Sequence, residues 1–261
     1  MKTILWYNMF KVINMAERWL YNLFLATTLE KFLFFLFILL LVFISGFFLL
    51  LLAYISKYLK ISILQKSKQY SELNHCVTEG QIVFLGDSLT EFFKTAEFFP
   101  CFGVYNRGIA SDTTRGVLDR LADNVIAIKP RKVFLQIGTN DLGAKIPISR
   151  IVANIKEILT RMKESIPNVQ LYLLSLYPVN AFAVIFSAFF VRNRKNKDLQ
   201  RINVELEAFC IENNIKYINV FDRLTDEKGR LKKEYTVEGL HVSYDGYKVI
   251  SEILEPYLKE Q

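Results

Sequence analysis

The longest hydrophobic stretch of the chain lies near its N-terminus. Residues 32–55 read FLFFLFILLLVFISGFFLLLLAYI and contain no charged side chain. A helix that crosses a bilayer needs about 20 consecutive apolar residues, so this pattern predicts a single transmembrane helix. The stretch is too long, and begins too far from Met1, to be the apolar region of a cleaved signal peptide.

Polar residues mix with apolar ones on both sides of this stretch. Residues 1–31 combine aromatic and basic side chains, which is typical of an amphipathic segment lying at a membrane interface. Residues 56–79 are more polar and predict a tether with some helical character. Lys and Arg are balanced across the two flanks, so the positive-inside rule does not fix the orientation. We expect a cytoplasmic N-terminus, with the larger part of the chain outside the cytoplasm.

From residue 80 onward, short apolar runs alternate with segments whose apolar residues recur at helical spacing. Such a pattern distinguishes strands from helices, and strict alternation of the two is typical of a parallel sheet covered by helices on both faces. We therefore expect a three-layer α/β/α domain over residues 80–261. The predicted strands are 82–85, 104–106, 133–137, 169–176 and 215–220, and the predicted helices are 113–128, 148–165, 197–213 and 243–258.

Charge and composition narrow the choice of partners. Of the formal net charge of +7, residues 80–261 carry +3 and the membrane-proximal residues 1–79 carry +4. This distribution suits lysines beside lipid headgroups and argues against nucleic acid as a partner. The chain has 3 widely spaced cysteines and 2 histidines, which form neither a disulfide framework nor a zinc motif, so we expect no metal and no cofactor.

Polar clusters follow three of the predicted strands, and a fourth precedes the last helix. Each cluster alone has the composition of an ordinary turn. In a parallel sheet, however, the carboxyl ends of the strands meet at one edge, where such folds bind ligands, so we expect one shared site. The clusters are Gly86-Asp87-Ser88, Asn106-Arg107-Gly108, Gly138-Thr139-Asn140-Asp141 and Glu238-Gly239-Leu240-His241.

These clusters resemble the SGNH hydrolases, also called the GDSL esterase/lipase family, over about residues 81–258. The residues that give the family its name correspond to Ser88, Gly108, Asn140 and His241. The resemblance implies a flavodoxin-like fold, with Ser88 as nucleophile and His241 as base. It also implies an oxyanion hole made of the Ser88 and Gly108 N–H groups and the Asn140 amide. Where the family usually has Asp, three residues before the histidine, this chain has Glu238, a carboxylate that can still orient the imidazole.

An unusual insertion follows Pro178. Residues 181–191 are apolar except for Ser187, and Arg192, Arg194, Lys195 and Lys197 come next. The stretch is too short to span a bilayer. It is either a buried helix or strand extension, or a lid or membrane-dipping loop whose cations meet anionic headgroups.

These features predict a membrane-anchored serine esterase that hydrolyses carboxylic esters through an acyl-enzyme. Within that class we favour O-acetyl groups on a cell-envelope glycan over lysophospholipids or other lipid esters. The fold accommodates both kinds of substrate, so this preference is an analogy with the family. An acyltransferase could use the same Ser-His site to acylate a sugar hydroxyl. A membrane-tethered binding module with an inactive site is the third possibility.

Overall fold

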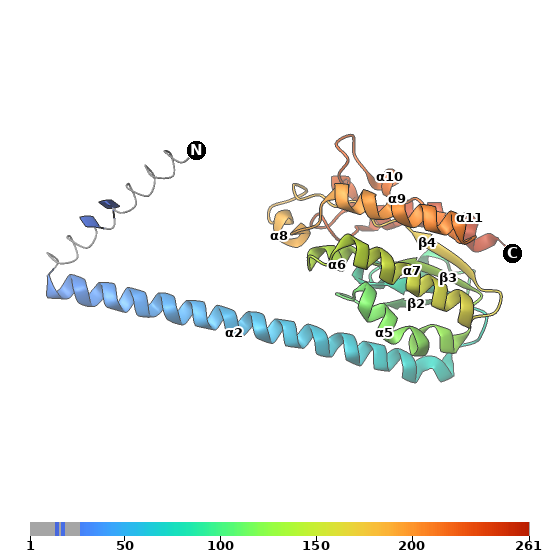
Figure 1. Cartoon of the computed structure of the whole chain (residues 1–261), viewed down its shortest axis with the longest axis horizontal. Coiled ribbons are helices and arrows are strands. Elements are labelled where there is room, and N and C mark those ends of the chain that lie inside the picture. The colour runs from blue at the N-terminus through green and yellow to red at the C-terminus, as the bar shows by residue number, and fades with distance from the viewer. Residues whose placement is uncertain (1–13, 16, 19–26, 261) are drawn as a thin grey trace. The chain divides into compact units, whose positions relative to one another are not determined.

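The computed structural model describes residues 14–15, 17–18 and 27–260 of the chain (Figure 1). The chain divides into two compact units, Met1–Leu59 and Lys60–Gln261. Most of the interfacial segment predicted for residues 1–31 lies outside the described residues, and that prediction stays untested.

A single long helix, α2, contains the predicted transmembrane stretch. It runs over Thr28–Glu72, and its first turn is closed by Thr27 and Glu30, each of which accepts a hydrogen bond from the other's backbone N–H. The apolar side chains of residues 32–55 are nearly all exposed. Within the described part of the chain, this is the one helix long and apolar enough to cross a membrane.

The second unit is built on a parallel sheet, as the strand and helix alternation predicts. In the described part of the chain this sheet has five strands in the order β2-β1-β3-β4-β5. Because consecutive strands are parallel, each pair is joined by a crossover containing helices. The strands are β1 Ile82–Gly86, β2 Val104–Gly108, β3 Lys132–Gln136, β4 Gln170–Leu174 and β5 Lys216–Ile218.

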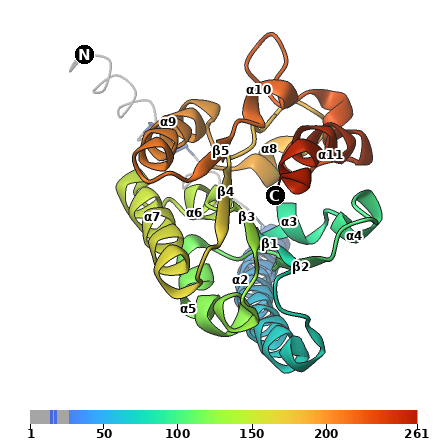
Figure 2. The ribbon, with the colours of Figure 1, turned by 90° about the vertical axis from the view of Figure 1, so that its right-hand side faces the viewer.

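Helices cover both faces of the sheet and complete three layers. Figure 2 shows α5, α7 and α9 on one side of the strands, and α4 and α11 on the other. The helices of this unit are α3 Ser88–Glu91, α4 Thr95–Phe98, α5 Thr114–Asn124, α6 Thr139–Gly143, α7 Ile148–Ser165, α8 Ser187–Val191, α9 Asn196–Glu212, α10 Phe221–Leu224 and α11 Tyr244–Lys259, with short 3₁₀ turns at Leu73–Cys76, Ile126–Ile128 and Lys233–Tyr235.

The alternation of side chains along β1 divides the core into two halves. Val83 and Leu85 pack with α5, α7 and α9, whereas Phe84 faces the opposite layer with α11. The Phe84, Phe134 and Tyr172 rings occupy matching positions on three adjacent strands and stack with centroid separations of 4.8 and 4.4 Å. This burial on both faces fixes β1, and therefore the position of the residues that follow it.

The second unit begins earlier than the sequence indicates. The predicted tether, residues 56–79, continues as α2 up to Glu72, and its part from Lys60 belongs to the second unit. The buried Asn124 amide donates to Ser67 O and Ser71 Oγ at 3.0 and 2.9 Å. The polar side chains that indicated a tether are therefore hydrogen-bonding partners of the domain.

This packing predicts that residues 60–79 are needed for full stability. A protein that begins at Lys60 should melt at least about 4 °C above one that begins at Gln81, because the shorter protein leaves buried polar groups such as the Asn124 amide unpaired. Thermal unfolding followed by circular dichroism measures the difference. Equal melting temperatures would show that this part of α2 contributes nothing to the fold.

Candidate active site

Ser88 stands at the carboxyl end of the central strand β1. Asp87 caps the short helix α3, since its Oδ1 accepts the Leu89 N–H at 2.9 Å. From the other side, the Tyr247 hydroxyl of α11 donates to Leu89 O at 2.9 Å. Ser88 is 6% exposed, so its hydroxyl is held in a defined place while remaining accessible at the edge of the sheet.

His241 connects Ser88 to a carboxylate. The distance from His241 Nε2 to Ser88 Oγ is 3.1 Å, and His241 Nδ1 lies 2.5 Å from Glu238 Oε1. Both side chains of the His-Glu pair are partly shielded, at 27% and 12% exposure. A serine, an imidazole and a carboxylate in this linear order match the geometry of a nucleophile, a base and an orienting acid.

The turn that carries Glu238 and His241 is rigidly built. The Thr236 hydroxyl donates to His241 O at 2.8 Å and accepts the Gly239 N–H at 2.8 Å. Gly239 has a φ of +95°, and a Cβ there would lie 2.1 Å from Asn180 O. Only glycine therefore allows the turn to approach the segment after β4 this closely, and the Asn180 N–H completes the contact by donating to Gly239 O at 2.8 Å.

Asn140 faces the same edge from the start of α6. Its Nδ2 donates to Asp112 O at 2.9 Å and lies 3.5 Å from Asp87 Oδ2, while its Oδ1 accepts from Arg194. The amide group thus lies between the loop after β2 and the turn that precedes Ser88. Neither the contact with Arg194 nor the burial of that side chain was expected from the sequence.

Gly108 is placed differently from the role that the resemblance implies. Its N–H donates to Asn106 Oδ1 at 2.9 Å and is not free. Two positions further along comes Ala110, and then Ser111, which has a φ of +66°. The Ser111 N–H meets no acceptor within the described residues, and the neighbouring Asp112 is the one that holds Asn140.

Buried carboxyl groups brace the loops behind the site. Burial raises the pKa of Asp87 to about 7, although its hydrogen bond from Leu89 N–H opposes that shift. Burial also raises the pKa of Asp112, which is paired with the buried Arg120 at 2.8 Å. Arg120 donates in turn to Gly86 O at 3.1 Å, so this ion pair ties the loop after β2 to the end of β1.

A pocket of about 430 Å³ opens beside His241. Its walls are largely aromatic, and the Phe92 ring lies 5.3 Å from the imidazole. Such a lining suits an apolar part of a substrate next to the reacting bond. The lining residues are Phe92, Lys94, Phe98, Val237, Glu238, His241, Val242, Ser243, Tyr244 and Tyr247.

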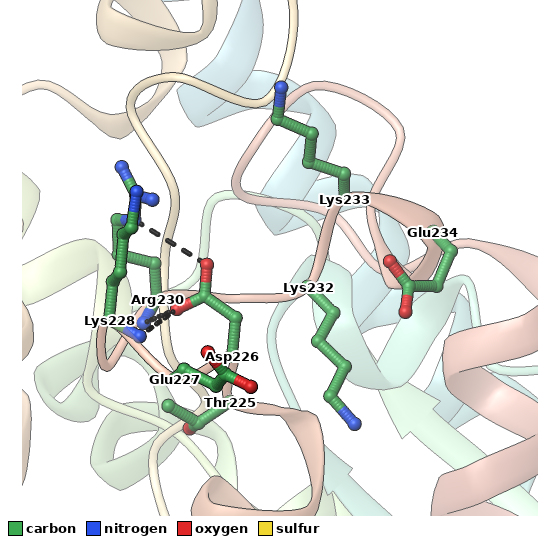
Figure 3. A pocket seen from close by; sticks show the side chains of 8 residues that line it. All are labelled: Thr225, Asp226, Glu227, Lys228, Arg230, Lys232, Lys233 and Glu234. Atoms are coloured by element: carbon green, nitrogen blue, oxygen red, sulfur yellow. Dashed lines mark hydrogen bonds and ion pairs between the residues drawn. The ribbon is translucent and has the colours of Figure 1, made fainter.

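A larger pocket, of about 660 Å³, has a different character. Its lining is mostly charged, and Figure 3 shows Asp226 engaged by Arg230 while Lys232 and Lys233 point elsewhere. None of the site residues described above contributes to it. Of the two pockets, only the one beside His241 is lined by residues of the candidate site, namely Glu238 and His241.

The insertion matches neither alternative from the sequence fully, neither a buried helix or strand extension nor a lid or membrane-dipping loop whose cations all face outward. Most of its large apolar side chains are exposed rather than buried, with Ile185 at 82% and Phe186 at 76%. Its basic tail is divided, because Arg192 is exposed whereas Arg194 is buried at 9% exposure. The apolar part is thus a surface loop, and at least one of the expected lipid-facing cations points into the domain.

Comparison with known proteins identifies the fold and the family of the chain. A solved structure from Streptococcus pneumoniae, named for platelet activating factor, is 33% identical and superposes with a TM-score of 0.74, covering 78% of this chain and 96% of its own. The alpha2 subunit of rat platelet-activating factor acetylhydrolase IB is 24% identical over 191 residues, 70% of this chain and 79% of the relative.

The chain spans less than half the length of the first curated relatives that it matches. N-acylneuraminate cytidylyltransferase of Streptococcus agalactiae is 22% identical over 182 residues, but the match spans only 40% of that protein. The model of the GDSL-like Lipase/Acylhydrolase family matches residues 84–249 and so includes the strand before Ser88 as well as His241. The chain therefore belongs to the GDSL-like lipase/acylhydrolase family, a family of hydrolases that act on esters.

Proposed function

We propose that this chain is a membrane-anchored serine esterase that cleaves carboxylic esters through an acyl-enzyme on Ser88. The observation that carries the proposal is the line from Ser88 Oγ to His241 Nε2, at 3.1 Å, and from His241 Nδ1 to Glu238 Oε1, at 2.5 Å. In this arrangement the carboxylate holds the imidazole with Nε2 unprotonated toward the serine.

The reaction runs in two halves. Ser88 Oγ attacks the ester carbonyl carbon while its proton passes to His241 Nε2, and a tetrahedral oxyanion forms. His241 then gives that proton to the leaving alcohol, and the acyl group remains on Ser88. A water molecule then attacks the acyl carbonyl carbon while its proton passes to the same nitrogen. The second tetrahedral oxyanion collapses, the bond between that carbon and Ser88 Oγ breaks, and His241 returns the proton to Ser88 Oγ as the carboxylic acid leaves. The Glu238 carboxylate stabilises the imidazolium in both halves.

The oxyanion needs N–H donors close to Ser88. The Ser88 N–H begins α3 and has no partner within that helix, and the Asn140 amide lies beside the preceding turn. We include both in the proposed oxyanion hole. Gly108 can join them only if Asn106 releases its N–H, so the free N–H of Ser111 is the alternative from the same loop.

For the substrate we propose a small acyl group, such as O-acetyl on a cell-envelope glycan. The acetylhydrolase among the relatives supports a short acyl chain, although its low identity supplies no detail. A lipid ester is the alternative, and the exposed aromatic loop and the aromatic pocket favour it. The same acyl-enzyme could also acylate a sugar hydroxyl, which product analysis with an added alcohol acceptor would reveal.

We also propose that α2 anchors the enzyme as a single transmembrane helix, with the catalytic unit outside the cytoplasm. The exposed apolar surface of residues 32–55 supports this proposal. After alkaline carbonate extraction, the full chain should remain in the membrane pellet. Recovery in the supernatant would contradict the anchor.

The esterase activity predicts a simple chain-length experiment. Full-length protein in detergent should hydrolyse nitrophenyl acetate faster than the decanoate, and Ser88→Ala should lower kcat by about 10⁴-fold or more. A preference for the decanoate would favour the lipid-ester alternative. If wild type and Ser88→Ala released nitrophenol equally slowly, the proposed function would be wrong.

The proposed role of Glu238 predicts an ordered set of rates. Glu238→Gln should lower kcat by roughly 100- to 10,000-fold because an amide can hold His241 in the wrong tautomer. Glu238→Asp keeps the charge and should stay within about tenfold of wild type. Glu234→Gln, at an exposed position four residues away, is the matched control and should be neutral. Normal turnover by Glu238→Gln would exclude the orienting role.

A further inference from the structure

Arg194 is a buried guanidinium in the last part of the insertion, between α8 and α9. Its Nε donates to Thr139 O at 2.8 Å, and its Nη1 donates to Phe190 O and Val191 O at 3.1 and 3.3 Å. Its Nη2 donates to Asn140 Oδ1 at 2.9 Å. The guanidinium is therefore a bridge between the insertion and the first turn of α6.

The immediate surroundings are shaped to admit this group. A Cβ on Gly143 would lie 2.6 Å from the Arg194 guanidinium carbon, so the glycine leaves the space that the side chain fills. The neighbouring Asn193 reinforces the contact, because its Nδ2 donates to Gly143 O at 3.0 Å. By contrast, Arg192 in the same segment is exposed.

The contact also decides which way the Asn140 amide faces. A guanidinium can only donate and a backbone carbonyl can only accept. Arg194 holds Oδ1 and Asp112 O holds Nδ2, so both contacts favour the same orientation of the amide. With Arg194 removed, only the bond to Asp112 O would oppose rotation of the amide, a rotation that would bring its oxygen toward the turn that precedes Ser88, where it would repel a developing oxyanion.

We propose that Arg194 is a positioning residue, which holds the Asn140 amide so that one Nδ2 hydrogen bonds Asp112 O and the other faces the turn before Ser88, toward the reacting carbonyl. The inference rests on the proposed esterase chemistry and extends it to a residue outside the four polar clusters of the sequence. It also gives the insertion a role in the active site, in addition to the exposed aromatic surface that it forms. The donor set at the active site is complete only while the insertion is seated on α6.

The test is a double-mutant cycle in the full-length protein, with nitrophenyl acetate as substrate. Arg194→Met should lower kcat by about 10- to 100-fold and leave KM within about twofold, since the lost interaction acts on the transition state. In an Asn140→Ala background the same change should cost less than about threefold, because the group through which it acts is gone. Arg192→Met is the matched control and should keep wild-type kcat.

Each other outcome has a clear meaning. Equal losses in both backgrounds, or an unchanged kcat in a folded Arg194→Met protein, would overturn the inference while leaving the esterase proposal intact. If Arg194→Met does not fold, Arg194→Lys takes its place in the same cycle, because it keeps the charge but not the multiple donors. If wild type itself hydrolyses no ester, the proposed function and the inference both fail.

Discussion

The hydrogen bond between Ser88 and His241 is the contact on which the arrangement depends. It joins residues 153 positions apart, one after the central strand β1 and one before the last helix α11. Because β1 is buried on both faces, Ser88 cannot shift without disturbing the sheet. His241 is fixed just as firmly by Thr236, Glu238 and the close approach of Gly239 to Asn180. The distance between Ser88 Oγ and His241 Nε2 therefore depends on the packing of the sheet and on the turn before α11.

Two accessory segments reach the same edge from opposite sides. On the β2 side, the Tyr70 hydroxyl of α2 donates to Gly108 O at 2.9 Å, and Lys66 is paired with Glu91 of α3. On the α6 side, Arg194 of the insertion holds Asn140. Neither segment is part of the sheet and helix alternation. Both contact elements that border Ser88, namely the end of β2, α3 and the first turn of α6. These contacts link the helix proposed as the anchor, and the segment with the exposed aromatic residues, to the candidate active site.

The regular part of the fold could be predicted from the sequence because it follows from hydrophobic periodicity. The buried run 82–85 and the long amphipathic helices α7 and α11 were predicted within a few residues of their observed bounds. Helices of four or five residues, such as α3 and α8, were not, since a single turn has no period to recognise. The candidate site residues lie together because Ser88 and Asn140 stand in the first turns of helices that follow β1 and β3, and Glu238 and His241 lie in the turn before α11.

What the sequence could not provide depends on partners distant in the chain. Arg194 follows an apolar run and precedes other cations, which is also the pattern of a solvated or lipid-facing tail. Its burial is favourable because Thr139 O and Asn140 Oδ1, more than 50 residues away in the chain, accept from it together with Phe190 O and Val191 O. The predicted tether gives a second example. In the sequence, Ser67 and Ser71 predict a solvent-exposed segment, and only the structure shows that the Asn124 side chain hydrogen-bonds to both residues. A sequence motif also does not predict that the Gly108 N–H donates to the Asn106 side chain, two residues earlier.

The central claim is that Ser88 is a nucleophile activated by His241. Its most direct test is to treat the full-length protein in detergent with a fluorophosphonate and to locate the adduct by peptide mass spectrometry. The account predicts one adduct per chain, on the peptide that contains Ser88, and at least about a 100-fold slower reaction in His241→Ala. An adduct on a different serine, or the absence of any adduct on a folded protein, would contradict it.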